Sequence, residues 1–264
     1  MTGSTWFLTS RKATGNVPRV YCFAHAGGNP RLFLKWQDHM GDDAEIVAVC
    51  PPGRAHRGRE SSAADLTALA ADVAREIAAT ADQPFLLFGH SLGAVVAFET
   101  ARRLDGHPLI RHVIASAASA PSLLPSEKVR ETARLTGTDF TRAVEVFGGL
   151  PPEVIANEGL QELLLAGLRA DFRMAAAYIY RSSAPLAVPL TLIAGRGDRT
   201  ITETALEPWR LESTDVPECH WVEGGHFYFD QRPSAVTDVL RPIVRAVSLR
   251  SAQSSQPMEA GHAS

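Results

Sequence analysis

Residues 83–94 of the chain read QPFLLFGHSLGA, and this order predicts a strand, a tight turn and the start of a helix. The apolar run before Gly89 does not alternate with polar residues, as is typical of a strand buried on both faces of a parallel sheet. Gly89 and Gly93 flank Ser91, and because they lack Cβ atoms the chain can turn there very tightly. Such a turn holds a serine in a strained conformation with its hydroxyl exposed. We therefore expect Ser91 to act as a nucleophile.

Strand patterns on both sides of this turn alternate with helix patterns. Residues 19–24, 46–50 and 109–117 are short apolar runs, and a segment with apolar residues at helical spacing begins after Ser62 and Asp65, which resemble a capping box. Strands that alternate with helices form parallel sheets with right-handed crossovers. The sequence therefore predicts the α/β class, with a mostly parallel central sheet flanked by helices.

The alternation stops between about residues 121 and 183, where helical patterns are broken by glycine and proline and the longest runs from 161 to about 180. We predict a helical lid inserted over the carboxyl ends of the strands, the edge at which open α/β sheets bind ligands. Strands follow at 188–194 and near 219–222, and then a helix over 233–248. We expect one domain over residues 1–248 and a disordered tail over 249–264, which is rich in Ser, Gln and Ala.

Length and composition exclude several classes of protein. The 264 residues suffice for one large domain, and a net charge of -3 without a long basic run argues against nucleic-acid binding. The three cysteines are too few for a disulfide framework. The chain shows no membrane span, and its first residues lack the apolar core of a signal peptide. We expect a cytoplasmic monomer that does not bind membranes.

A serine nucleophile needs a base, which works best when a buried carboxylate orients it. In an α/β-hydrolase fold these partners follow in the order serine, acid, histidine, each on a loop at the end of a strand. Asp198 lies in a glycine-rich turn directly after the strand at 188–194, and we predict that it is the acid. Asp215 and Glu223 are alternatives in later loops.

The base is one of nine histidines. His226 follows two glycines in a loop before the last helix, and it comes after the acid in the chain. His220 lies in a strand pattern instead, and His90 lies within the tight turn, where its side chain does not easily point the same way as Ser91. We predict that His226 is the base.

An oxyanion hole needs two backbone N–H groups directed at the developing negative charge. Leu92, directly after the nucleophile, supplies one, and the glycine-containing loop after the strand at 19–24 supplies the other. We assign the second donor to Ala26, with His25 or Gly27 as alternatives if the register differs by one. The residues together indicate an α/β-hydrolase fold and an acyl-transfer or hydrolytic enzyme that uses no metal and no cofactor.

Six short motifs occur together in this chain, at residues 22–28, 52–54, 89–93, 169–172, 195–198 and 224–227. With them, the chain resembles the type II thioesterases of polyketide and nonribosomal-peptide assembly lines over about residues 19–245. The resemblance implies that Ser91, Asp198 and His226 form a catalytic triad with Ala26 and Leu92 at the oxyanion hole. It also implies a substrate carried as a thioester on the phosphopantetheine arm of an acyl or peptidyl carrier protein, and an editing role that removes stalled or misprimed acyl groups.

Two departures from this family pattern concern the site. The family usually has proline where this chain has Ala24, and again where it has Arg199. Neither change removes a catalytic group, and both are compatible with an enzyme that releases a particular product. A carboxylesterase or lipase acting on free esters is the competing enzyme class. A silent binding module is a third reading, against which the intact serine, aspartate and histidine argue.

The resemblance also suggests contacts with the acyl chain and with the carrier protein. Apolar residues of the lid either shape an acyl chamber or only pack the lid onto the core, and the loops add further candidates. A carrier protein is usually acidic, so one of two arginine clusters is a candidate docking surface. The substrate candidates are His25, Gly27, Leu164, Leu168, Phe172, Met174 and Phe227, and the arginines are Arg54, Arg57 and Arg59 or Arg102, Arg103 and Arg111.

Overall fold

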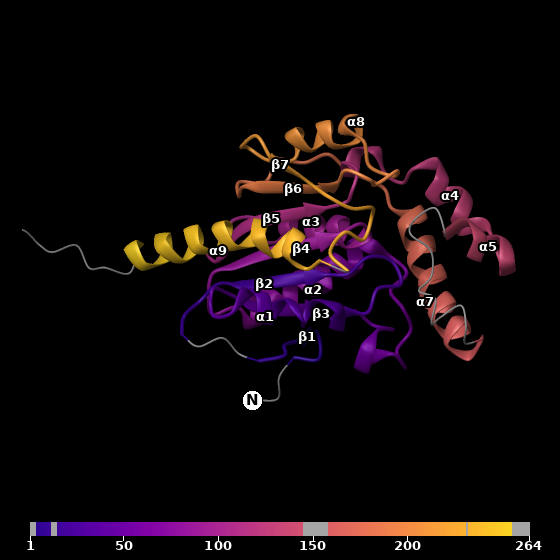
Figure 1. Cartoon of the computed structure of the whole chain (residues 1–264), viewed down its shortest axis with the longest axis horizontal. Helices are drawn as coiled ribbons and strands as arrows, with labels where there is room; N and C mark the ends of the chain where they lie inside the picture. Colours follow the sequence, from indigo (N-terminus) through magenta and orange to yellow (C-terminus); the bar gives the residue numbers. More distant parts are fainter. Residues whose placement is uncertain (1–3, 12–14, 145–157, 231, 255–264) are drawn as a thin grey trace, which may run out of the picture.

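The computed structural model describes residues 4–11, 15–144, 158–230 and 232–254. Within these residues one seven-stranded sheet has the order β1-β3-β2-β4-β5-β6-β7. Strands β2 to β7 are parallel, whereas the short edge strand β1 pairs antiparallel with β3. The predicted, mostly parallel sheet is confirmed (Figure 1). The strands are β1 Phe7–Leu8, β2 Arg19–Phe23, β3 Glu45–Val49, β4 Phe85–His90, β5 Ile110–Ser116, β6 Leu190–Gly195 and β7 Glu218–Val222.

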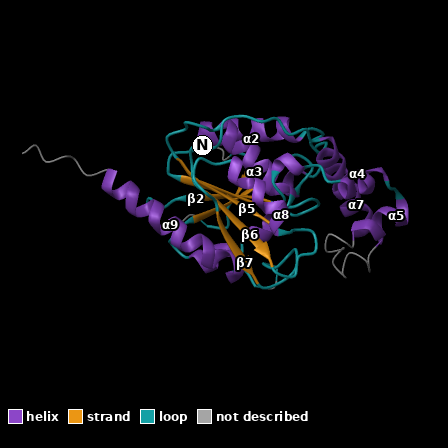
Figure 2. Ribbon diagram, turned by 90° about the horizontal axis from the view of Figure 1, so that it is seen from above, coloured by secondary structure: helices purple, strands orange, loops and turns teal. Residues whose placement is uncertain are grey.

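Helices cover both faces of the sheet. On one face α2 (Leu66–Thr80) packs against α3 (Leu92–Arg103), and on the other α9 (Ser234–Ser254) packs against α1 (Trp36–Met40). Figure 2 shows α2 and α3 on one side of the strands and α9 on the other. Short helical segments occupy the connections, namely η1 Pro30–Phe33, η2 Ala55–Arg57, α8 Glu203–Leu206 and η5 Glu207–Leu211. The central strands are buried throughout, which explains why their sequences do not alternate.

Two helix boundaries differ from the sequence prediction. The N-cap of α2 is Asp65, whose carboxylate accepts a 2.8 Å hydrogen bond from the Ala68 N–H, so the predicted capping box at Ser62 is wrong. The aspartate directly precedes the helix and satisfies its free donors by itself. At the other end of the chain, α9 continues to Ser254, past the expected end near Ser248. Residues 255–264 of the predicted tail lie outside the described residues.

The described elements between β5 and β6 are all helical: η3 Pro121–Leu123, α4 Glu127–Arg134, α5 Gly137–Val144 and α7 Glu158–Ala177. Residues 145–157 of the predicted insertion lie outside the described part of the chain. Helices α4, α5 and α7 gather beyond one end of the strands (Figure 1). Helices α5 and α7 form a small apolar cluster from Phe140, Val144, Leu168 and Phe172, and Val129 and Ala133 of α4 pack against it. Among the described helices, none has the length and apolar character needed to cross a bilayer.

Candidate active site

Ser91 occupies the tight turn between β4 and α3. Its backbone angles are φ 54° and ψ -120°, a region that residues with a side chain rarely adopt. Added Cβ atoms would overlap the Gly93 carbonyl at Gly89, and the Phe23 carbonyl at Gly93. Both positions therefore require glycine, because the strand, the helix and the end of β2 approach one another here. The turn is fixed further by a 2.8 Å hydrogen bond from the Ser91 N–H to the Ser116 carbonyl.

The loops after β6 and β7 bring together an aspartate and a histidine. His226 Nδ1 lies 2.7 Å from Asp198 Oδ2. The other carboxylate oxygen, Oδ1, accepts from the Thr200 N–H at 2.8 Å and from its hydroxyl at 2.7 Å. Burial alone raises the pKa of the Asp198 carboxyl, but the bonds from His226 and Thr200 outweigh it and lower that pKa below its ordinary value. The carboxylate thus stays ionised and holds the Nδ1–H tautomer of the imidazole.

Thr200 is a site residue that the sequence analysis missed. Its position two residues after an aspartate in a glycine-rich turn is a signal that was available, since aspartates commonly accept from the backbone two residues ahead. The rejected acids lie elsewhere: Asp215 is exposed, and exposed Glu223 pairs with Arg196 at 3.3 Å. Asp198 is the carboxylate that the fold brings to His226.

Ser91, His226, Ala26 and Leu92 line one cavity of about 160 Å³. The remaining walls are mainly apolar side chains, among them Leu124, Val129 of α4, Phe172 of α7 and Tyr178, which directly follows α7. Ser91, His226 and both predicted oxyanion donors thus line a common, largely apolar space. Among the described residues, no group of three or more His, Cys, Asp or Glu is arranged to hold a metal ion.

Among the predicted substrate contacts, Phe172 lines this cavity. Leu168 instead packs against the loop at Gly27 and into the apolar cluster of the inserted helices. His25 is packed against Phe227, with ring centroids 4.7 Å apart. Met174 lines a second, smaller cavity of about 50 Å³, and Leu164 is half-buried. The Gly27 N–H donates to Asp171 Oδ2 at 2.7 Å, so this alternative oxyanion donor is already occupied.

A second histidine lies next to His226. His90 is fully buried, its ring centroid is 5.1 Å from that of His226, and its Nδ1 is 2.7 Å from Ser116 Oγ, which bonds in turn to the Tyr228 hydroxyl. Burial, with a smaller contribution from His226, lowers the pKa of His90 well below its ordinary value and that of His25 to about 4. Both rings are therefore neutral near pH 7.

Most of the arginines considered for carrier docking are bound within the fold. Arg54 pairs with Asp171 at 2.5 Å, and Arg57 pairs with Glu60 at 2.6 Å and stacks over the Trp6 ring. These two guanidinium groups are thus engaged by other parts of the chain. Arg59, in the same cluster, is exposed.

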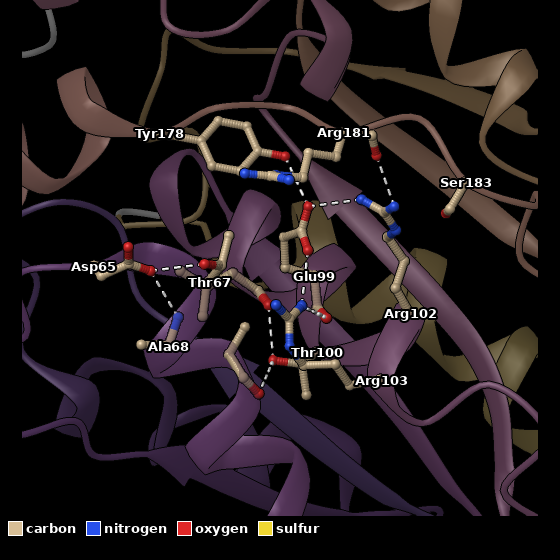
Figure 3. Close-up of polar contacts among 12 residues, drawn as sticks. Asp65, Thr67, Ala68, Glu99, Thr100, Arg102, Arg103, Tyr178, Arg181 and Ser183 are labelled. Atoms are coloured by element: carbon tan, nitrogen blue, oxygen red, sulfur yellow. Dashed lines mark hydrogen bonds and ion pairs between the residues drawn. The ribbon is translucent and has the colours of Figure 1, made fainter.

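The second arginine cluster is organised around Glu99 of α3 (Figure 3). Arg102 and Arg103 pair with its two carboxylate oxygens at 2.9 and 2.8 Å, and the Tyr178 hydroxyl donates to it at 2.8 Å. Arg102 also donates to the Arg181 carbonyl at 2.7 Å. These contacts tie α3 to the segment that follows α7, so the arginines have a structural role.

The chain was compared with known proteins. Residues 18–246 match the family model of the thioesterase domain. Thioesterase PikA5 of Streptomyces venezuelae is 32% identical over 86% of this chain and 81% of its own length. Gramicidin S biosynthesis protein GrsT of Aneurinibacillus migulanus is 29% identical, over 84% of this chain and 87% of its own.

Two solved structures extend the similarity to three dimensions. YbtT, a type II thioesterase from the yersiniabactin NRPS/PKS pathway, has a TM-score of 0.81 at 30% identity and covers 92% of this chain and 99% of its own. RedJ, a thioesterase from the prodiginine pathway in Streptomyces coelicolor, has a TM-score of 0.76 at 31% identity, with coverage of 87% and 90%. The predicted α/β-hydrolase fold is confirmed by these matches and by the sheet.

Proposed function

Since the chain belongs to the thioesterase domain family and is a type II thioesterase of the polyketide and nonribosomal-peptide kind, we propose that it hydrolyses acyl groups from the phosphopantetheine arm of acyl or peptidyl carrier proteins. The observation that carries this proposal is the 2.7 Å contact between His226 Nδ1 and Asp198, on loops that place His226 and Ser91 around one apolar cavity. An oriented imidazole and a serine that line the same cavity are the groups needed for acyl transfer.

In the first half of the reaction, His226 Nε2 accepts the proton of the Ser91 hydroxyl while Ser91 Oγ attacks the thioester carbonyl. The N–H groups of Ala26 and Leu92 donate to the oxyanion of the tetrahedral intermediate. The intermediate collapses as the C–S bond breaks, and the imidazolium returns its proton to the leaving thiolate. The products of this half are an acyl-Ser91 ester and a free carrier thiol.

In the second half, His226 takes a proton from water, and the hydroxide oxygen attacks the ester carbonyl. The same two N–H groups stabilise the second oxyanion. The C–O bond to Ser91 then breaks, and the proton on His226 passes to the serine oxygen. Asp198 stays ionised throughout and stabilises the imidazolium that forms in each half. The low pKa of its carboxyl supports this role.

The cavity supports an acyl chain as the group transferred, because its walls beyond the polar residues are apolar. We assign the inserted helices to a lid, since α7 supplies Phe172 to the wall. The proposed role is editing, in which stalled or misprimed chains are removed from carrier proteins. Likeness to type II enzymes of such pathways supports this role.

The test exposes the protein to a panel of acylated carrier proteins and follows intact mass. A transient acyl adduct on Ser91, released carrier thiol, and loss of both in Ser91→Ala are the expected results. Broad turnover of short or aberrant chains supports editing, whereas turnover of a single chain points to product release. Faster hydrolysis of a free nitrophenyl ester than of every carrier thioester, at equal concentration, would contradict the proposal and favour a carboxylesterase.

A further inference from the structure

The loop after β2 carries one of the two proposed oxyanion donors within a defined turn. The Gly28 N–H donates to the His25 carbonyl at 2.9 Å, and Gly27 has a φ of 70°. These are the features of a type II turn with Ala26 and Gly27 at its centre. The direction of the peptide between these two residues distinguishes a type II from a type I turn. What holds that peptide therefore controls the backbone of Ala26.

The central peptide is held by a carboxylate from α7. The Gly27 N–H donates to Asp171 Oδ2 at 2.7 Å, and the same oxygen accepts from Arg54 Nη2 at 2.5 Å. Arg54 Nη2 also donates to the Gly167 carbonyl, one turn earlier on α7, at 3.0 Å. The Asp171 and Arg54 side chains are 13% and 11% exposed, so these charge-assisted bonds are largely shielded from water.

A second side chain of α7 covers the same turn. A Cβ on Gly27 would come within 2.8 Å of Leu168 Cδ1, so the bare glycine allows the helix to approach this closely. Leu168 and Asp171 are three residues apart and therefore lie on one face of α7. Phe172, next along the helix, lines the cavity. One helix thus covers the acyl site and also anchors the loop beneath it.

We infer that Asp171 is a positioning residue for the oxyanion hole, through which α7 fixes the Ala26–Gly27 peptide. This inference rests on the proposed function. It adds that the chemical step requires α7 to be packed against the loop after β2. Without the carboxylate the turn is free to interconvert between types I and II, because glycine accepts both conformations. The Ala26 N–H then loses its fixed position, which weakens binding of the oxyanion more than binding of the ground-state thioester.

The primary variants are Asp171→Ala and Asp171→Asn. For the alanine variant we expect kcat on an acyl-carrier thioester to fall roughly 10- to 100-fold, with KM within about twofold of the wild-type value. Asparagine retains an oxygen for the Gly27 N–H but lacks the charge opposite Arg54, so its loss of kcat is smaller. Arg173→Ala is the matched control, because Arg173 is an exposed residue on the same helix. It leaves kcat and KM unchanged.

Two substrate analogues separate positioning from mere support of the cavity. The Ser91 hydroxyl adds to the carbonyl of a trifluoromethyl ketone and gives a tetrahedral adduct with an oxyanion. A thioether has a methylene in place of the carbonyl, so it binds the same cavity without forming an oxyanion. In Asp171→Ala the affinity for the ketone falls by about the same factor as kcat/KM, and the affinity for the thioether is unchanged. Equal loss of affinity for both analogues in Asp171→Ala, or an unchanged kcat in the folded Asp171→Ala protein, overturns the inference.

The proposed function is tested separately in the same series. Hydrolysis of the thioester that survives in Ser91→Ala overturns the proposed function itself. Hydrolysis that requires Ser91 but not Asp171 overturns only the positioning role.

Discussion

Two aspartates are assigned to the same proposed site, Asp198 as the acid and Asp171 as a positioning residue, and the surroundings of their side chains differ. The Asp198 side chain is 1% exposed and accepts three hydrogen bonds, from His226 and from the N–H and hydroxyl of Thr200. The Asp171 side chain is 13% exposed and faces Arg54 and a single backbone N–H. The pKa of the Asp198 carboxyl lies below its ordinary value, whereas burial raises that of Asp171 in spite of Arg54.

For Asp198 the hydrogen bonds together outweigh the effect of burial on the pKa, whereas for Asp171 burial outweighs the hydrogen bonds and the charge of Arg54. Asp198 lies on a loop of the sheet and its donors come from the same loop and the next one, so they are held rigidly. Asp171 lies on an inserted helix and joins it to two loops of the core. We therefore expect the first aspartate to govern the chemistry directly and the second to govern it through the position of α7.

The largest effect is expected for Asp198→Ala. Loss of the carboxylate frees the imidazole to adopt the wrong tautomer, so kcat should fall by roughly 10³- to 10⁴-fold. Steady-state hydrolysis of a carrier thioester measures it, and a loss below about tenfold would contradict the assignment of Asp198 as the acid.

A smaller effect is expected for Thr200→Val, which removes the hydroxyl bond to Asp198 and keeps the shape of the side chain. A hydrogen bond to a charged group contributes about 1.5–3 kcal/mol, so a drop in kcat of roughly 10- to 100-fold is expected, together with a higher pKa of the Asp198 carboxyl. Thr204→Val, at an exposed threonine of α8, is the control. Equal kcat in the two variants would show that Thr200 does not support the acid.

The two aspartates should also differ in how pH changes stability. The pKa of Asp198 is depressed on folding, so its stabilising contribution is present above its ordinary value of 3.8 and is lost as pH falls through the lower folded value. The pKa of Asp171 is raised, so its ionised form is disfavoured in the folded state, and the protein gains stability as pH falls through that higher value towards 3.8.

Urea unfolding of the wild-type protein, Asp198→Asn and Asp171→Asn across this range measures both effects. Relative to Asp171→Asn, the wild-type protein becomes more stable as pH falls from 7 towards 4. Relative to Asp198→Asn, it loses its advantage only below 3.8. Slopes of the same sign for the two pairs would refute the contrast between the carboxylates.

The smallest effect is expected for Glu223→Gln. This exposed carboxylate pairs with Arg196 and lies outside the cavity wall, so kcat should change by less than about twofold, within the usual range for surface substitutions. The measurement is the kcat for hydrolysis of a carrier thioester by Glu223→Gln, compared with that of Asp198→Ala. A loss as large as that of Asp198→Ala would return Glu223 to the list of candidate acids.

The sequence predicted the parts of the site that depend on local geometry. The tight turn at Ser91 needs glycine at positions 89 and 93, because a close backbone contact leaves no room for a side chain at either position. This requirement can be recognised directly in the sequence. Asp198 and His226 were found from their order in the chain and their glycine-rich loops. Thr200 and the buried partners of His90 were missed, because their roles depend on atoms contributed by other loops and strands.

By itself, then, the sequence determined the parallel sheet, the turn that presents Ser91 and the positions of its two proposed partners, since these follow from apolar runs, glycines and chain order. Only the tertiary structure decided which charges meet. The sequence analysis took Arg54 as a candidate docking residue and Asp171 only as part of a family motif. The two residues are 117 positions apart in the chain, yet they pair at 2.5 Å beside the loop that follows β2. This pairing depends on how α7 packs against the rest of the fold, and no local sequence pattern predicts a contact between residues so far apart in the chain.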